Sequence, residues 1–537
     1  MNKNRLTYLT NILFPCVVFS ALAGTLTAAL IFLFKIASSE LISLSERIYD
    51  AVRADLRLLP LLLVGAALVG LAAAFLLIKA PDSRGGGIPT AIAALRGYVP
   101  FEKMISIVTV FISSMLTYLA GVPLGTEGPS VQIGTLTGWI TSKTFGKKHP
   151  AWDRYIMTGG ACAGFSAATG APLTGIFFAF EEAHRRFSPM IFMIASMTVA
   201  VCTAVSEILC SFFNVSSSLF HFEVSAVLPI KYLWLPIAVG FVCGICALIF
   251  TKAYRFMRIN ILPHLSKIPF VLRIMIVFIL TAVIGVCSKS FVGTGHSLID
   301  ELIEGQGAWY LLIIYLCVRA VMMIVSNTQG VTGGLFVPNL AFGAIIGAIC
   351  GKIAVSSGIL PREYYIIVVI IGMVSFLGAS SRTPITALTF AVEALSGMSN
   401  ILPITVGVTF AFVVIESMGI PSFTDTVIEG KTEEYNHGRK VQTIDAYLTV
   451  GEDAFVIGKE IRDILWPPAC VIVSVNNAIS RARIGSGMAE GDVLHVHCQT
   501  SHPEITANSL EALVGKQTFD IIAHTESRPK SNQVPDA

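Results

Sequence analysis

Charged residues are scarce in this sequence. Asp, Glu, Lys and Arg together make up 13% of the 537 residues, and hydrophobic residues make up 54%. Soluble domains carry about a quarter charged residues. The composition therefore excludes an ordinary soluble domain and predicts an all-α polytopic membrane protein, with the lipid bilayer as its surroundings.

The usual signatures of catalysis and of metal or nucleic-acid binding are also absent. The net charge of +3 is too small to indicate a nucleic-acid partner, and the 11 cysteines lack metal-ligand spacing. Cys243 and Cys246 share a helix face, which we interpret as two small buried residues. No nucleophile triad or phosphate loop is present, so we expect a protein that is not an enzyme and needs no metal or cofactor.

Apolar runs recur along the chain, but several of them are short. Runs such as Ile105–Ala120 and Ile366–Leu377 are shorter than the roughly 20 residues that a helix needs to cross a bilayer. Short segments interrupted by Gly and Pro are typical of transporters with broken helices. After the first span, the charged segment Ser38–Arg57 is expected to end a helix and connect two spans at the surface.

One charge lies inside this apolar region, in the segment Gly125-Thr126-Glu127-Gly128-Pro129-Ser130. Pro129 favours the first turn of a helix. The free N–H groups at a helix start, with the positive end of the helix dipole, form an anion site. Glu127 can fill that site when it is ionised, or leave it to a soluble anion when it is protonated. One residue could therefore compete with an anion and carry a proton.

The two halves of the chain repeat one pattern. Three features recur at separations of 208, 209 and 212 residues, namely Gly87 with Gly295, Pro129 with Pro338, and Pro172 with Pro384. They indicate two repeats, roughly 10–215 and 225–425. The loop Thr141–Arg154 after the first motif is strongly basic and therefore cytoplasmic, whereas the corresponding loop of the second half is not. We therefore expect inverted repeats whose motif helices meet near the membrane midplane.

The chain becomes polar near residue 432. We expect a transport domain over 1–431, a linker over 432–442, a small α/β domain over 443–516 and a tail over 517–537, whose end from Thr525 to Ala537 is disordered. Val471–Val475 and Val493–His497 predict strands, and His495 and His497 of the latter are interpreted as a solvated strand face.

The motifs GGGIP (Gly85–Pro89), GTEGP (Gly125–Pro129) and GGLFVP (Gly333–Pro338) resemble the three signature motifs of the CLC family of chloride channels and proton-coupled antiporters. The resemblance covers about residues 6–431. It implies a homodimer in which each subunit, an inverted repeat of tilted helices, has its own anion path. It also implies a bacterial inner-membrane location, with both termini cytoplasmic.

By this resemblance, Glu127 is the external gating glutamate and Glu182, in Gly170–Glu182, is the internal proton glutamate of antiporters. It also implies a set of anion-binding residues. These are Gly86, Gly87, Ile88, Thr126, Gly128, Leu335, Phe336, Val337 and Phe423. Gly86 and Phe423 stand where the family has a serine and a tyrosine, so two hydroxyl donors to the central anion are absent.

The favoured function is exchange of chloride for protons, and the alternative is a passive voltage- or pH-gated channel for chloride or nitrate. Glu182 favours exchange, because family channels usually lack it. The C-terminal segment is similar to TrkA-C domains, through Gly458–Ile461, Gly491–Leu494 and Leu510–Gly515. That similarity implies a cytosolic module that contacts a second subunit or binds a small molecule. A TrkA-C-regulated cation transporter is disfavoured, since helix N-termini repel cations.

Overall fold

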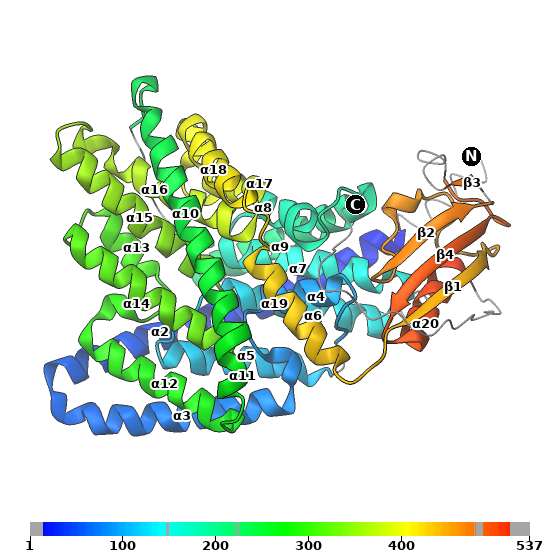
Figure 1. Cartoon of the computed structure of the whole chain (residues 1–537), viewed down its shortest axis with the longest axis horizontal. Coiled ribbons are helices and arrows are strands. Elements are labelled where there is room, and N and C mark those ends of the chain that lie inside the picture. Colours follow the sequence, from blue (N-terminus) through cyan, green and yellow to red (C-terminus); the bar gives the residue numbers. More distant parts are fainter. Residues whose placement is uncertain are drawn as a thin grey trace.

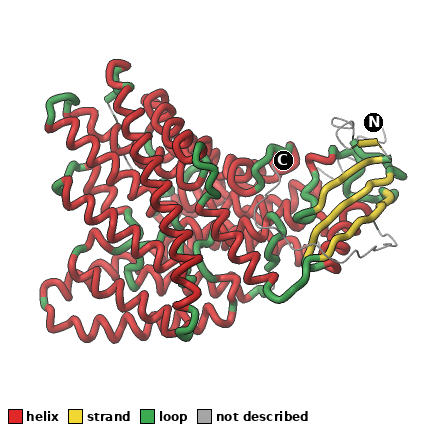
Figure 2. The backbone as a smooth tube through the Cα atoms, in the orientation of Figure 1, coloured by secondary structure: helices red, strands yellow, loops and turns green. Residues whose placement is uncertain are grey.

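The computed structural model describes residues 14–515 except 102, 146–149, 221, 223, 225, 477 and 480–486. The expected tail over 517–537, the chain start and the lysines 147 and 148 of the basic loop lie outside the described residues. The described chain forms a large helical part and a small sheet domain at one end (Figures 1 and 2). The predicted fold class is therefore confirmed.

Apolar helices make up the helical part, and nine of the described helical segments are long and apolar enough to cross a membrane. The helices of the first half are α2 (Phe14–Ala54), α3 (Leu59–Lys79), α4 (Ile88–Leu95), α5 (Ile105–Leu119), α6 (Glu127–Phe145), α7 (Asp153–Thr169), α8 (Pro172–Phe178), the π-helix η5 (Ala179–Ala183) and α9 (Pro189–Phe213).

The second half continues the helical architecture. Its helices are α10 (Trp234–Phe256), α11 (Leu262–Leu265), α12 (Phe270–Cys287), α13 (His296–Ile303), α14 (Trp309–Thr328), α15 (Phe336–Ser356), α16 (Tyr365–Ser381), α17 (Pro384–Ala394), α18 (Ile401–Glu416) and α19 (Phe423–Asn436).

Two expectations about helix ends differ from the structure. Residues 38–54, expected to end a helix and form a connection, continue α2 as one helix to Ala54. The helix persists because its buried residues, including Ser38, Ser45 and Tyr49, pack on neighbouring segments. Residues 432–436, expected in a linker, extend α19 to Asn436.

Glycines let the helices of each half pack backbone to backbone. A Cβ on Gly134 of α6 would lie 2.1 Å from the carbonyl oxygen of Gly160 in α7, and the reverse distance is also 2.1 Å. In the second half, a Cβ on Gly343 of α15 would lie 2.3 Å from the carbonyl oxygen of Gly372 in α16. These contacts tolerate no side chain, so the small residues at the contacts allow the helices to pack closely.

Equivalent hydrogen bonds also join the two halves of the chain, and we call this pair of contacts the clasp. The carboxylate of Glu181 in η5 accepts hydrogen bonds from the backbone N–H groups of Ile385 and Thr386 at the start of α17, at 2.8 and 2.6 Å. The carboxylate of Glu393 in α17 accepts from the N–H groups of Leu173 and Thr174 of α8, both at 2.8 Å. Such exchanged contacts are the mark of a two-fold relation, here between the two repeats.

The sheet domain contains β1 (Gln442–Thr449), β2 (Cys470–Val475), β3 (Ala478–Ile479), β4 (Val493–Thr500) and α20 (Pro503–Val514). Its four-stranded antiparallel sheet has the order β1-β4-β2-β3. The two predicted strands are thus present as β2 and β4. Cys470 and Cys498 lie opposite each other on these strands and form a disulfide, which the sequence spacing did not reveal.

The sheet domain docks on the start of α7. Arg154 donates from Nη1 to the carbonyl oxygens of Leu465 and Trp466 at 3.0 and 2.9 Å, and the Tyr155 hydroxyl donates to the carbonyl of Asp463 at 2.8 Å. The domain therefore lies on the same side as the basic loop Thr141–Arg154. Figure 1 shows α6 running toward this domain and α15 lying on the far side of the helical part.

Candidate functional site

The three glycine-rich motifs meet at one place, where α4, α6 and α15 begin. Gly125 and Gly334 exchange two backbone hydrogen bonds of 2.7 Å each, which join the second motif to the third. A Cβ on Gly87 would lie 2.2 Å from the carbonyl of Gly128, and a Cβ on Gly128 would lie 2.3 Å from the Gly86 oxygen. Only glycine allows this approach, so the motif glycines bring three helix N-termini together.

Free backbone donors concentrate at this junction. The first N–H groups of a helix have no acceptor within the helix, and α4 begins at Ile88, α6 at Glu127 and α15 at Phe336. The segment that starts α15, Leu335 to Val337, is buried. Three buried helix starts at one junction make a positive environment for a bound group.

Glu127 occupies this environment. Its side chain is fully buried, at 0% exposure. The Thr126 hydroxyl donates to Oε1 at 2.8 Å, and the backbone N–H groups of Val337, Thr126 and Glu127 face the same carboxylate. Oε2 is buried and has no hydrogen bond with any residue that the structure describes; it would lie 2.6 Å from a Cβ on Gly125. The carboxylate thus stands between α6 and α15, with one oxygen free to hold a proton.

Glu182 lies in the π-helix η5, and its side chain is buried, at 8% exposure. The Thr424 hydroxyl of α19 donates to its Oε1 at 3.1 Å. Arg96 donates to the backbone carbonyl of Glu182 at 2.8 Å and also faces Asp425 of α19, at 3.6 Å. π-Helical turns are frequent at functional sites, and this one directs a buried acid toward the N-terminus of α19.

Phe423 is the first residue of α19 and lies between the surroundings of Glu182 and Tyr254 of α10. It is 4% exposed and lies next to Thr424, the partner of Glu182. Its ring packs edge-on against Tyr254 of α10, with 4.3 Å between ring centroids. Gly86 is close to the third motif, since its Cβ would lie 3.8 Å from the Gly333 oxygen and 3.1 Å from Nδ2 of Asn327. No motif pointed to Tyr254 or Asn327, because they come from helices distant in sequence, whereas Thr424 directly follows Phe423.

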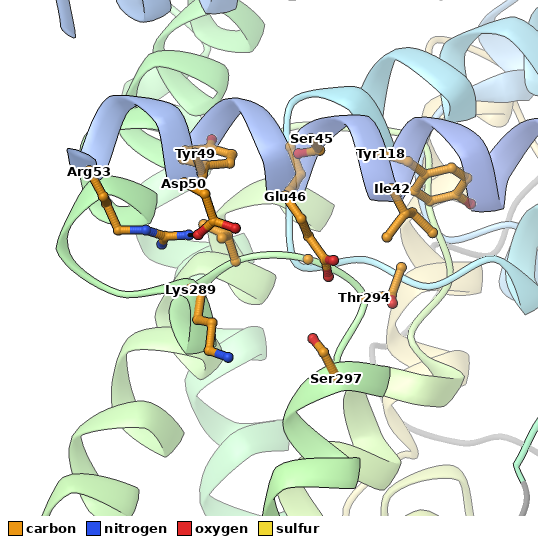
Figure 3. A pocket seen from close by; sticks show the side chains of 13 residues that line it. Ile42, Ser45, Glu46, Tyr49, Asp50, Arg53, Tyr118, Lys289, Thr294 and Ser297 are labelled. Carbon is orange, nitrogen blue, oxygen red and sulfur yellow. Dashed lines mark hydrogen bonds and ion pairs between the residues drawn. The ribbon is translucent and has the colours of Figure 1, made fainter. Parts of the chain in front are cut away.

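A cavity of about 140 Å³ opens at the far end of α2 from the sheet domain. In Figure 3, Glu46 and Asp50 point from α2 toward the segments that carry Lys289 and Ser297. Tyr118 also lines the cavity, and its hydroxyl donates to the carbonyl oxygen of Gly125 at 2.9 Å. Tyr118 therefore links the cavity to the motif that holds Glu127. Its acidic residues come from the segment that the sequence had suggested as a surface connection.

Two residues of the sheet domain that could have suggested a metal have another role. His495 pairs with Asp445 and stacks on Tyr447 of the neighbouring strand, with 4.4 Å between ring centroids. His497 lies 3.6 Å from the same aspartate. Within the described residues no group of three or more His, Cys, Asp or Glu side chains could hold a metal ion.

Comparisons with known proteins agree with this architecture. The H(+)/Cl(-) exchange transporter ClcA of Klebsiella pneumoniae (strain 342) is 28% identical over 380 residues, which cover 69% of this chain and 79% of the relative. The protein of the same name from Salmonella typhimurium (strain LT2) is 28% identical over 379 residues, covering 69% and 78%.

Solved structures show the same fold. The crystal structure of a slow cyanobacterial Cl⁻/H⁺ antiporter matches with a TM-score of 0.71 at 21% identity, over 79% of this chain and 99% of that one. A CLC-type fluoride/proton antiporter matches with a TM-score of 0.65 at 19% identity, covering 77% and 98%. The sequence model described as "Voltage gated chloride channel" matches residues 65–416. With the three motifs at one junction, this match shows that the chain belongs to the voltage-gated chloride channel (CLC) family.

Proposed function

We propose that this protein is a secondary active antiporter that exchanges chloride for protons, with a separate path in each subunit. The observation that carries the proposal is the position of Glu127, a buried carboxylate at the junction of α6 and α15. While ionised, it takes the place of an anion at these helix starts. When protonated it loses its charge, so an anion can replace it. One group therefore binds the proton and yields to the anion, which couples the two fluxes.

The remaining site residues would form two groups, one around a central anion and one at an outer anion position. The N–H groups of Leu335 and Phe336, with Gly86, Gly87, Ile88 and Phe423, would surround a central anion. Those of Thr126, Gly128 and Val337 would hold the outer position that Glu127 occupies. This division is supported by the contact of Gly128 with both Gly86 and Gly334.

Glu182 is proposed to pass protons between the cytoplasm and the anion path. Its support is its burial and its bond with Thr424, next to Phe423. On the opposite side, the cavity lined by Glu46 and Asp50 offers acidic groups near Tyr118 and Gly125 for protons entering from outside. The relatives named as exchange transporters support exchange over a passive channel.

The anion flux under an imposed pH gradient tests this proposal. Purified protein in liposomes with equal chloride on both sides should accumulate chloride when protons flow out of the liposomes, because exchange links the two movements. A passive channel would give no net accumulation driven by protons at zero membrane potential. Protein-free liposomes provide the baseline.

A homodimer is proposed from the surface of the clasped helices. Apolar side chains there are exposed in one subunit, with Leu173 at 54%, Phe192 at 47%, Ile385 at 51% and Leu402 at 54%. Leu173 and Ile385 follow Pro172 and Pro384 at equivalent places of the two repeats. A second copy could cover both repeats equally. Light scattering of the detergent-solubilised protein measures the mass and would contradict the dimer by giving that of one chain.

We propose that the sheet domain is a cytosolic TrkA-C-type module, that both termini are cytoplasmic and that the protein resides in a bacterial inner membrane. The docking of the domain beside the basic loop supports this orientation. Disulfides are rare in the cytosol, so Cys470 and Cys498 should be reduced in the cell. Alkylation of thiols before lysis should label both residues, and an intact disulfide in living cells would contradict the orientation. The ligand of the domain would be a small molecule.

A further inference from the structure

Two other polar side chains lie where the hydroxyls of the family's serine and tyrosine are missing, at residues 86 and 423. Gly86 and Phe423 have no side-chain hydrogen-bond donor. Asn327 at the end of α14 lies beside Gly86, and Tyr254 of α10 lies beside Phe423. The Tyr254 hydroxyl donates to Oδ1 of Asn327 at 3.0 Å, across 73 residues of sequence. Both residues are buried, at 3% and 5% exposure. In this arrangement Oδ1 of Asn327 faces Tyr254 and Nδ2 faces Gly86.

The other end of that amide has no partner among the described residues. Nδ2 of Asn327 is buried and makes no hydrogen bond with any of them. It lies 3.1 Å from the position of a Cβ on Gly86, which is where a serine side chain would begin. A buried N–H donor without an acceptor is costly to a folded protein. A ligand that accepts hydrogen bonds at this place would remove that cost.

The ring of Tyr254 lies beside residue 423, where the family has a tyrosine. The rings of Tyr254 and Phe423 meet edge-on, with 4.3 Å between centroids. The hydroxyl of Tyr254 therefore serves Asn327 and positions its amide. Packing with Phe423 holds the Tyr254 ring in place.

We propose that Nδ2 of Asn327 is a direct ligand of the central anion, a small monovalent anion of the halide or nitrate class, and that Tyr254 is its positioning residue. This inference rests on the proposed anion path between the first and third motifs. The amide takes over the donor role that a serine would have at residue 86. The central site then keeps a side-chain donor despite the loss of two hydroxyls.

Calorimetric titration with chloride tests the assignment on the purified full-length protein. Asn327→Leu should lower the chloride affinity by about 10-fold or more, since hydrogen bonds to charged groups are strong. Asn327→Asp, with nearly the same shape, should lower it at least as much, because a carboxylate repels the anion. Tyr254→Phe keeps the ring and should cause a smaller loss. It should add nothing in the Asn327→Leu background, because Tyr254 acts only through the amide.

Rescue separates a ligand role from a purely structural one. Gly86→Ser should restore a large part of the affinity in the Asn327→Leu background, because the serine hydroxyl replaces the lost donor. Gln329→Leu is the matched control. Gln329 is also a buried amide with an unpartnered Nε2, but its Oε1 accepts from Arg273 at 3.2 Å, outside the motif junction. This variant should bind chloride as the wild type does.

The outcomes distinguish this inference from the proposed function. Unchanged affinity in both Asn327 variants, or a loss that Gly86→Ser does not restore, overturns the assignment even if the wild type exchanges chloride for protons. Absence of exchange by a wild type that binds chloride contradicts the antiporter proposal, but the affinities of the Asn327 variants still decide the assignment.

Discussion

The reciprocal clasp between the repeats gives a prediction whose size follows from the structure. Glu181 accepts three hydrogen bonds at the start of α17, from Ile385 N, Thr386 N and Thr386 Oγ1, at 2.8, 2.6 and 2.7 Å. Glu393 accepts the equivalent three from Leu173 N, Thr174 N and Thr174 Oγ1 at the start of α8, at 2.8, 2.8 and 2.7 Å. Equal substitutions should therefore have equal effects.

The perturbation is Glu181→Gln, compared with Glu393→Gln. If the amide oxygen replaces Oε2, two of the three bonds persist and the amide nitrogen faces the N–H of Ile385 or Leu173. The variant loses one bond to a charged acceptor, about 1.5–3 kcal/mol. It also loses a charge at a helix N-terminus, about 0.3–1 kcal/mol. Each substitution should thus lower the free energy of unfolding by roughly 2–4 kcal/mol.

Thermal unfolding in detergent, followed by the loss of monodisperse protein, measures the effect. The midpoints of the two variants should fall by several degrees and agree with each other, and the double variant should fall further. Glu429→Gln, at an exposed glutamate of α19, should leave the midpoint unchanged. A fall in only one of the two clasp variants would refute the two-fold argument, and no fall in either would refute the clasp itself.

Three further predictions concern transport and the sheet domain. Glu182→Gln should stop proton transport while anion flux, measured by chloride efflux from liposomes, remains. Gly86→Ser with Phe423→Tyr should raise the chloride affinity measured by calorimetry above that of either single variant, and equal affinities would show that these positions do not line the anion site. Burial lowers the pKa of Lys459 to about 8, so the unfolded chain binds more protons between pH 8 and the usual lysine pKa. Stability should therefore rise with pH over that interval, and Lys459→Met should flatten this rise in unfolding midpoints measured at pH 7.5 and pH 10.

The sequence predicted those parts of the fold that local signals encode. Pro129, Pro172 and Pro384 mark helix starts. The similar sequence separations of Pro129 from Pro338 and of Pro172 from Pro384 predicted the two repeats. The sheet domain was predictable because its strands alternate and its composition is polar. The assignment of individual site residues stays a prediction, since it rests on motif positions.

Other features could be identified only from the three-dimensional structure. Glu181 and Glu393 occur in the repeated segments, yet nothing in the spacing says that each caps a helix of the other repeat. Asn327 meets Tyr254 across 73 residues, and no periodic pattern records such a pair. Helix α4 is only 8 residues long and buried throughout, so a hydropathy profile alone cannot place it. Contacts between separate buried helices leave no mark on the local sequence.

Proton movement driven by a chloride gradient, in wild type and in Glu127→Gln, tests the central claim most directly. Liposomes loaded with chloride and diluted into low chloride are followed with a pH electrode and a chloride electrode. The wild type should move protons against their own gradient as chloride leaves. Glu127→Gln should release chloride without moving protons, because an amide neither carries a proton nor competes as a charge. Uphill proton movement by Glu127→Gln, or none by the wild type while chloride flows, would contradict the account.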